Sequence, residues 1–390
     1  MTTFVHQNLD VSAASVVASG AALYPAVDRI SSVSQIALHP NTAPATDVQR
    51  AAIMENPGFG KYFTDNVVRA VWTKEAGWHD RELIAASASA GGIGMNALHY
   101  GQSIFEGLKA YRHADGGVFT FRPEANALRF QRSAHRLALP PVPTDLFIGA
   151  IEALVRQDEV WVPTDEEQSL YLRPLEFGSE GALGVRPSMH VTFVLMASPV
   201  GAYFPQGVKP VSVWLSDDYV RAAPGGTGEA KCAGNYASSL IAQAEASDNG
   251  CDQVVWIDAI ERKYIEEMGG MNMYFVYGEG SNARLVTPKL TGTLLPGVTR
   301  DSILTLARDL GYQVEEGTIT VDEWRNGCTT GEISETFACG TAAVITPVGR
   351  VDSKNSGSWN IADGGSGAIT MQLRKALVDI QPGKTTDTHH

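Results

Sequence analysis

One lysine of this chain stands in an unusual setting. Lys231 lies in the stretch GGTGEAKCAGNYASSL, where nearly all its neighbours are Gly, Ala, Ser or Cys. Small side chains let a bulky planar ligand approach the backbone, and a lysine amine in apolar surroundings can act as a nucleophile. Tyr236 follows in the same stretch and could donate a hydrogen bond to such a ligand. The alternatives are a surface lysine on a glycine-rich loop and a tyrosine of the core.

Two adjacent carboxylates form a second candidate. Glu266 and Glu267 precede Gly-Gly and an apolar run in YIEEMGGMNMYFV. Because side chains alternate along a strand, the two point in different directions, and one can face inward. A buried carboxylate needs a cationic or donating partner, and a protonated ring nitrogen would serve. The alternative is a solvated strand end.

A third feature is suited to phosphate. LLPGVTRDSIL places a Pro-Gly turn before a helix, so the amides of Val298 and Thr299 are free at its positive end. CGTAAVITPV, residues 339–348, offers another Gly-Thr pair. An aldehyde cofactor such as pyridoxal phosphate requires an amine, a carboxylate, a phenol and a phosphate cup, and the chain has a candidate for each. These residues alone indicate a candidate lysine Schiff-base enzyme.

Composition limits the class of protein. The chain has 390 residues, 44% of them hydrophobic and 19% charged, which predicts a globular protein of two domains. Its net charge of −13 argues against nucleic acid as a partner. The four cysteines have no metal-binding spacing, so we expect no metal and a reducing cytoplasm. No signal peptide or membrane span is evident, so no membrane partner is expected.

The pattern of the first half predicts α+β structure. GLKAYR and VFTFR alternate like strands on either side of HADGG, which favours a hairpin. A helix follows Pro123, with one stripe of apolar residues and a second of arginines, and another helix is expected over 144–157. The apolar stripe comprises Ala127, Phe130, Ala134 and Leu137, and the arginine stripe comprises Arg129, Arg132 and Arg136. SLYLRPLEFG and HVTFVLMAS read as strands.

The second half predicts a further domain. VSVWLS, QVVWID, MNMYFVYG and RLVTP read as strands, and TRDSILTLARDL as a helix with Ile303, Ala307 and Leu310 on one face and Gly311 as its stop. We expect a fold of the α/β (α+β) class with four parts along the chain. These parts are an N-terminal arm over 1–64, a small α+β domain over 65–198, an interdomain loop over 199–207, and a larger domain over 208–384.

Several of these stretches, in this order, resemble the branched-chain amino acid aminotransferases. The likeness covers about residues 58–382 and rests on ALHYGQSIFEGLKAYR, YLRPLEF, GGTGEAKCAGNYASSL, YIEEMGGMN, LLPGVTRDSI and FACGTAAVITPV. The resemblance implies a two-domain fold-type IV enzyme with a pseudo-barrel C-terminal domain. It implies pyridoxal 5'-phosphate between the domains and transfer of the amino group of L-leucine, L-isoleucine or L-valine to 2-oxoglutarate by ping-pong kinetics.

The resemblance assigns cofactor roles residue by residue. Lys231 matches the lysine that holds the cofactor and is the catalytic residue, Tyr236 the tyrosine near the ring oxygen, and Glu267 the carboxylate at the ring nitrogen. Arg129 matches the phosphate-binding arginine, a choice that periodicity leaves open. The remaining matches in the ring and phosphate pocket are Leu295, Gly297, Val298, Thr299 and Thr341.

The resemblance also assigns substrate contacts and a homodimer. Residues matching the family's substrate pocket are Phe105, Gly107, Tyr171, Arg173, Tyr203 and Ala342, while Tyr100, Leu183 and Val185 match residues that reach in from a second subunit. Phe105 and Val185 suit an aliphatic side chain, and Arg173 suits the side-chain carboxylate of glutamate. Preference among leucine, isoleucine, valine and aromatic substrates stays open.

Rival functions share the fold. A D-amino-acid or (R)-amine transaminase or an aminodeoxychorismate lyase resembles the cofactor residues but lacks FEGLKAYR combined with Tyr171 and Arg173. A non-catalytic protein that binds pyridoxal phosphate is the rival of another class. Gly270 and Val200 stand where some relatives have threonine and tryptophan. No role is assigned to Cys232 or Cys339.

Overall fold

The structure, a computed structural model, describes residues 36–58, 62–86, 94–165, 168–181, 183–201 and 207–389. Its internal contacts divide the chain into two units. The first runs up to Gly201 and resumes at Asp379, and the second is Ala202–Val378. The domain bounds expected from the sequence stay a prediction.

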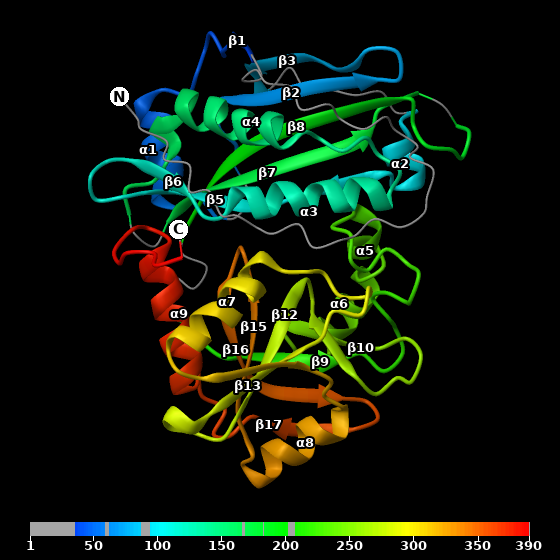
Figure 1. Cartoon of the computed structure of the whole chain (residues 1–390), viewed down its shortest axis with the longest axis vertical. Coiled ribbons are helices and arrows are strands. Elements are labelled where there is room, and N and C mark those ends of the chain that lie inside the picture. The colour runs from blue at the N-terminus through cyan, green and yellow to red at the C-terminus, as the bar shows by residue number, and fades with distance from the viewer. Residues whose placement is uncertain are drawn as a thin grey trace. The chain divides into compact units, whose positions relative to one another are not determined.

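The first unit is built on one sheet of eight strands in the order β1-β3-β2-β8-β7-β5-β6, with β4 paired to β7 (Figure 1). All neighbours are antiparallel except β1 and β3. The strands are β1 (Ala37–His39), β2 (Asn66–Thr73), β3 (Gly77–Ala85), β4 (Ser103–Phe105), β5 (Leu108–Arg112), β6 (Val118–Thr120), β7 (Ser169–Gly178) and β8 (His190–Val200). The predicted hairpin is confirmed, because β5 pairs with β6 and Gly116 takes a positive φ in the turn.

Helices α2 (Asn96–Tyr100), α3 (Pro123–Arg136) and α4 (Thr144–Gln157) of the first unit pack against this sheet. They are accompanied by α1 (Asp47–Glu55) and the short 3-10 helix η2 (Glu159–Trp161). Phe130 of α3 and Phe147 of α4 contact each other and Phe193 of β8, with ring centroids 5.6 to 6.3 Å apart. The predicted helices are therefore confirmed, and their apolar faces form the core of this unit.

The predicted N-terminal arm contains regular structure within its described part. β1 extends the sheet, and α1 begins at a capping box in which Thr46 and Gln49 bond each other's backbone amides. Both elements are largely exposed, which explains their weak hydrophobic pattern. Residues 1–35 and 59–61 lie outside the described residues.

The second unit is a barrel. Its nine strands run in the order β11-β10-β9-β16-β15-β12-β13-β14, with β17 on β16, and β11 also pairs with β12. That extra pairing closes six strands into a ring, so the predicted barrel-like domain is confirmed. The strands are β9 (Val211–Leu215), β10 (Gln253–Ile257), β11 (Ile265–Met268), β12 (Met271–Tyr277), β13 (Arg284–Pro288), β14 (Gln313–Gly317), β15 (Ile333–Gly340), β16 (Val344–Ser353) and β17 (Gly357–Asn360).

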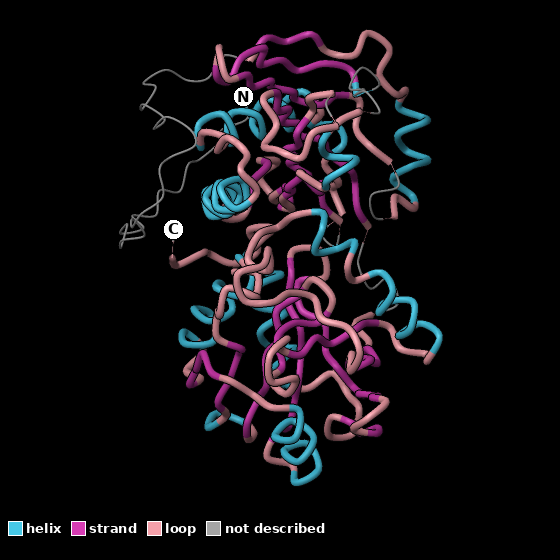
Figure 2. Tube along the Cα trace, turned by 90° about the vertical axis from the view of Figure 1, so that its right-hand side faces the viewer, coloured by secondary structure: helices cyan, strands magenta, loops and turns pink. Residues whose placement is uncertain are grey.

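Helices border the barrel, as Figures 1 and 2 show from two directions. They are α5 (Ala233–Ala237), α6 (Leu240–Asp248), η3 (Gly280–Asn282), α7 (Val298–Asp309), α8 (Val321–Thr330) and α9 (Ala368–Ile380). Trp324 of α8 is fully buried and makes edge-on contacts with Phe275 and Trp359 at 5.4 and 5.5 Å. Glu335 accepts hydrogen bonds from the Ile369 and Thr370 amides and so caps the start of α9.

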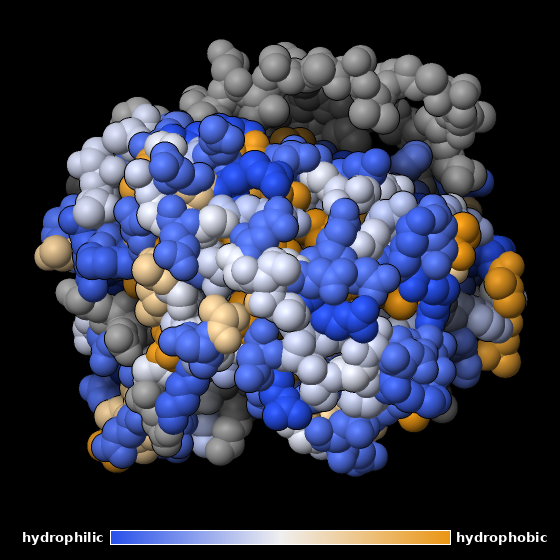
Figure 3. Space-filling view, turned by 90° about the horizontal axis from the view of Figure 1, so that it is seen from below, coloured by the Kyte–Doolittle hydropathy of each residue, from blue (hydrophilic) through white to orange (hydrophobic). Residues whose placement is uncertain are grey.

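The surface of the second unit shows no broad apolar area on the face in Figure 3. Hydrophilic residues dominate this face, and apolar side chains appear in small separate groups. Within the described part of the chain, no helix is both long and apolar enough to cross a membrane.

One buried carboxyl group in the first unit has no hydrogen-bond partner among the described residues. Glu176 of β7 is fully buried, in register with Ile104 on one side and Phe193 on the other. Neither of its carboxylate oxygens accepts a hydrogen bond from any described residue. Burial raises the pKa of Glu176 well above its ordinary value. The apolar surroundings therefore favour the protonated, neutral form of this side chain.

Glu176→Leu should stabilise the protein, and more so at high pH. Because the folded-state pKa is raised, the pH-dependent part of the cost of Glu176 is absent below the unfolded-state pKa of about 4.3, and only the cost of burying a neutral polar group stays. Above it, stability falls by up to about 1.4 kcal/mol per pH unit until the folded-state pKa is reached. Denaturant unfolding of parent and variant at about pH 5 and about pH 8 measures the difference. Glu82→Gln, at a half-exposed glutamate paired with Arg69, is the control. An equal gain at both pH values would contradict the prediction.

Candidate active site

A pocket of about 180 Å³ in the second unit brings together the lysine, tyrosine and glutamate singled out in the sequence. It is bounded by the loop before α5, by α5 itself, by β11 and by the segment before α7. Its lining residues are Arg221, Ala230, Lys231, Asn235, Tyr236, Ser239, Gln243, Gln253, Glu267, Gly269, Gly270 and Leu295. An amine, a phenol and a carboxylate thus line one space.

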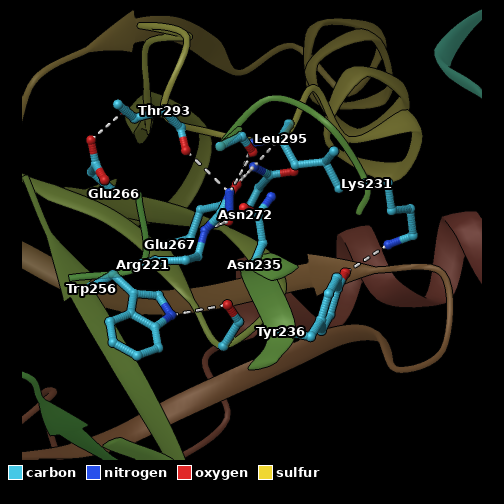
Figure 4. A network of polar contacts seen from close by, with 12 residues as sticks. Arg221, Lys231, Asn235, Tyr236, Trp256, Glu266, Glu267, Asn272, Thr293 and Leu295 are labelled. Carbon is cyan, nitrogen blue, oxygen red and sulfur yellow. Dashed lines mark hydrogen bonds and ion pairs between the residues drawn. The ribbon is translucent and has the colours of Figure 1, made fainter. Parts of the chain in front are cut away.

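Lys231 is held at the start of α5. Its Nζ lies 3.0 Å from the hydroxyl of Tyr236, which is on α5 (Figure 4). The amide of buried Asn235 donates to the carbonyls of Thr227 and Ala230, each at 2.8 Å, and so fastens the loop that carries Lys231. The Thr227 hydroxyl in turn donates a hydrogen bond to the side-chain oxygen Oδ1 of Asn235 at 2.7 Å. The lysine and tyrosine predicted as partners do face each other.

Both adjacent carboxylates are buried, on opposite faces of β11. Glu267 lines the pocket and is 2% exposed, while Glu266 is 6% exposed and accepts a hydrogen bond from the Thr293 hydroxyl at 2.5 Å. The alternative of a solvated strand end is therefore wrong. Burial raises the pKa of Glu267, and the Arg221 guanidinium acts in the opposite direction.

Arg221 is a site residue that the sequence analysis missed. Its Nε lies 2.6 Å from Oε2 of Glu267, and its side chain is 7% exposed. Lys231 was singled out because it lies among small residues, and Arg221 also has such neighbours, since Ala-Ala-Pro-Gly-Gly follows it. A cation among the smallest side chains is a feature that both residues share.

The helix start predicted as a phosphate site is tied to Glu267. α7 begins at Val298 with Gly297 as its N-cap, and no side chain caps it. The Leu295 amide donates to Oε1 of Glu267 at 2.6 Å. Asn272 bridges the two by donating to the same Oε1 at 3.2 Å and to the Leu295 carbonyl at 3.0 Å.

The predictions for the apolar face of α7 are confirmed for two of its three residues. Thr299 is buried at its first turn, and Ile303 and Ala307 are fully buried as predicted. Leu310 was expected on the same face, but it is 37% exposed, because it is the residue after the last helical turn. Gly311 follows with a φ of 87°, so the predicted stop is confirmed.

A strained turn carries the second Gly-Thr pair. Thr341 and Ala342 lie in the turn between β15 and β16, and both are half-buried. Val344, which begins β16, has a φ of 62°. A β-branched residue in this region costs about 1–3 kcal/mol, and such strain concentrates at functional sites. This turn is therefore kept among the candidate site segments.

The first unit holds Arg129 by a buried ion pair. Its Nε and Nη2 donate to the two carboxylate oxygens of Glu106 at 2.6 and 2.8 Å, and both side chains are at least 95% buried. Asn126 and the Gly107 amide also donate to Glu106, at 2.8 and 3.1 Å. The other arginines of the predicted stripe, Arg132 and Arg136, are exposed. The three arginines, which helical periodicity could not tell apart, therefore differ in burial, and of these only Arg129 lies inside the unit.

The predicted substrate residues of the first unit lie together. Arg173 donates to the Tyr171 hydroxyl at 3.1 Å, and its guanidinium carbon lies 4.8 Å from the ring centroid of Phe105. Gly107 leaves room for this arrangement, because a Cβ there would lie 1.9 Å from the Tyr171 hydroxyl. The arginine therefore contacts two aromatic rings, those of Phe105 and Tyr171, beside a glycine that cannot be enlarged.

The residues expected to reach a second subunit are exposed. Tyr100, Leu183 and Val185 are 43%, 69% and 82% exposed, and the Tyr100 hydroxyl donates to the Leu183 carbonyl. Tyr203 lies outside the described residues.

The remaining reactive residues form no metal site that the structure describes. Among the described residues, no three His, Cys, Asp or Glu side chains are grouped to hold an ion. The four cysteines are free and buried. Burial raises the pKa of the Cys339 thiol.

Comparison with known proteins defines the class. The profile of the family described as Amino-transferase class IV matches residues 103–351. The chain belongs to the class IV aminotransferase family, and it is an aminotransferase by descent and by fold.

Two sequence relatives and two solved structures that are similar to this chain are branched-chain amino acid aminotransferases. The chain is 58% identical to the branched-chain-amino-acid aminotransferase of Mycolicibacterium smegmatis over 90% of this chain and 95% of that protein. It is 55% identical to the one of Mycobacterium tuberculosis, over 89% and 94%. The crystal structure of the Escherichia coli branched-chain amino acid aminotransferase is similar at a TM-score of 0.66 and 29% identity, covering 82% of this chain and 96% of that one. The T.th. branched-chain amino acid aminotransferase with pyridoxamine 5'-phosphate gives the same TM-score and identity, covering 81% and 95%.

Gly107→Ala should damage the site without unfolding the protein. The new Cβ would displace the Tyr171 hydroxyl and, with it, Arg173, so we expect kcat/KM for transamination to fall about 100-fold. Gly149→Ala is the matched control, because a Cβ at that helical position meets nothing within 4 Å. The control should keep the parent rate and gain up to about 1 kcal/mol of stability. Equal rates in both variants would count against the proposed arrangement.

Proposed function

We propose that this chain reversibly transfers the α-amino group of L-leucine, L-isoleucine or L-valine to 2-oxoglutarate, which yields the branched-chain 2-oxo acid and L-glutamate. The observation that carries the proposal is the pocket in which Lys231, Tyr236 and Glu267 meet. The family membership and the relatives named as branched-chain-amino-acid aminotransferases at 55–58% identity support the same activity.

The pocket fits pyridoxal 5'-phosphate by the chemistry of its groups. The cofactor has an aldehyde, a phenolic oxygen, a ring nitrogen and a phosphate, and the unit offers an amine, a phenol, a carboxylate and the N-terminal end of α7, which no side chain caps. Gly270 lines the pocket beside this phenol, and a Cβ there would lie 3.3 Å from the Tyr236 ring. The residues that would hold the cofactor are Arg129, Lys231, Tyr236, Glu267, Leu295, Gly297, Val298, Thr299 and Thr341.

Each residue has a definite task in the proposed reaction. Pyridoxal phosphate, when bound, supplies an aldehyde that condenses with amines and a ring that accepts the electrons released at the substrate Cα. Lys231 would hold the aldehyde through Nζ, and the same amine would serve as the base and acid that moves the Cα proton of the substrate. Tyr236 would donate a hydrogen bond to the phenolic oxygen, and Glu267 would accept one from the protonated ring nitrogen. The same residues act in both half-reactions, so the kinetics are ping-pong.

The aromatic and arginine cluster of the first unit suits the substrate side chain. Phe105, Gly107 and Tyr171 offer apolar surface to an aliphatic chain, and Arg173 offers a guanidinium to the distal carboxylate of glutamate. Tyr203 and Ala342 complete the proposed set. Charge and apolar surface side by side would let one pocket accept both kinds of substrate in turn.

A homodimer would complete the site. Leu183 and Val185 are large apolar side chains that stand out into solvent beside Tyr100. We propose that these three residues enter the substrate pocket of a second copy of the chain, and sedimentation of the purified protein measures the assembly. We also place the protein in the cytoplasm, because all four cysteines are free thiols.

Lys231→Ala should abolish the activity. Without the amine, neither cofactor attachment nor proton transfer occurs, so transamination of L-leucine with 2-oxoglutarate should fall by at least about 10⁴-fold. Borohydride reduction of the cofactor-loaded parent followed by peptide mapping should find the adduct on Lys231. The assay also includes L-Ile, L-Val, D-Ala and 4-amino-4-deoxychorismate. A preference for either of the last two would replace the proposal with a rival of the same fold.

The two adjacent glutamates provide a matched pair of variants. Glu267→Gln removes the charge that faces the pocket, so kcat should fall by about 100-fold or more. Glu266→Gln changes the neighbouring carboxylate on the opposite face, where the Thr293 hydroxyl can still donate to the amide oxygen, so kcat should stay within about fivefold. Steady-state kinetics of both variants decide the matter. Similar losses in the two would mean that general burial of charge, not contact with the ring, explains the effect.

A further inference from the structure

Arg221 makes hydrogen bonds to two backbone carbonyls in addition to its ion pair with Glu267. Besides the contact of its Nε with Glu267 at 2.6 Å, its Nη2 donates to the carbonyls of Gly228 and Thr293 at 2.9 and 3.2 Å. The guanidinium is thus held from the loop that carries Lys231 and from the segment before α7. Figure 4 shows Arg221 beside Glu267 at the centre of these contacts.

Gly228 makes this arrangement possible. A Cβ at Gly228 would lie 2.3 Å from the Thr293 carbonyl oxygen and 2.7 Å from the Ala222 Cβ. Only a glycine lets the two carbonyls approach closely enough to accept from one nitrogen. This contact accounts for one of the small residues that precede Lys231.

The pair determines which form of Glu267 exists in the site. A carboxylate that is 2% exposed becomes neutral unless it is paired, whereas a guanidinium keeps its charge even when buried. Arg221 thus favours ionised Glu267, and Lys231 acts in the same direction, while Glu266 opposes them. An ionised carboxylate can only accept a hydrogen bond, but a neutral one can donate.

We propose that Arg221 is a positioning residue that keeps Glu267 ionised, so that the proton shared with a bound pyridine stays on the ring nitrogen. The inference rests on the proposed function, because it takes the bound group to be pyridoxal phosphate. A neutral Glu267 would donate to an unprotonated ring, which withdraws electrons from the substrate Cα less strongly. Arg221 therefore acts through Glu267 and need not touch the cofactor.

The test compares pyridoxal phosphate with its analogue in which carbon replaces the ring nitrogen. The parent should bind pyridoxal phosphate more tightly, because only the nitrogen can donate to Glu267. In Arg221→Gln this affinity ratio should fall at least about tenfold, since one partner of a buried charge pair is removed. The pH midpoint of the visible absorption change of the loaded protein should also rise, by about one unit.

Three further proteins make the result specific. Arg221→Gln in a Glu267→Gln background should lower the ratio no further than Glu267→Gln alone. Arg221→Lys keeps the charge but loses the several N–H donors of the guanidinium. Its affinity ratio should therefore lie between those of the parent and Arg221→Gln. Arg300→Gln removes another buried arginine, which bonds Glu316 and the Pro288 carbonyl, and should reduce thermal stability but leave the ratio as in the parent.

The outcomes separate this inference from the proposed function. A parent that binds no pyridoxal phosphate contradicts the proposed function. A parent that binds it, with the same ratio in whichever Arg221 variant folds, overturns the role of Arg221. A fall of equal size in Arg300→Gln overturns it as well, because the effect would then come from general loss of packing.

Discussion

The site of the second unit depends on giving one buried carboxylate enough partners away from water. Glu267 accepts hydrogen bonds or an ion pair from Leu295, Asn272 and Arg221, which belong to three separate segments of the barrel unit. Burying such a charge is costly unless every lone pair finds a donor. The closure of the barrel provides that condition, because β11 pairs with β12 and sets Glu267 opposite Asn272 in register. The fold and the charge therefore require each other.

The first unit also buries two glutamates, but only one of them has hydrogen-bond donors among the described residues. Glu106 is fully buried and takes two donors from Arg129 and one each from Asn126 and Gly107. Glu176 is equally buried, yet no described group donates to it. Burial alone thus does not mark a functional acid. What distinguishes Glu106 and Glu267 is that each orients an arginine and a backbone amide at a candidate site.

Local pattern was enough for much of the fold and for part of the site. The helices over 123–136 and 144–157 and the strands β7 and β8 follow their hydrophobic patterns. Lys231 and Tyr236 were found because they lie on one short segment. The same reasoning failed for Leu310, where the period continued past the end of the helix. It also passed over β1 and α1, whose exposed faces leave no such period.

The rest depends on contacts between distant residues, which no local pattern contains. Spacing could not choose between Glu266 and Glu267 or among the three arginines of α3, and resemblance to a family made both choices. The structure gives the physical reason: Arg221 and Glu106 lie far along the chain from the residues they pair with. The glycines also differ in whether local sequence explains them. Gly311 is readable as a helix stop, but Gly228 is small because Thr293, on another segment, needs its space. The small residues around Lys231 therefore serve both ligand access and the close approach of the backbone segments that hold Arg221.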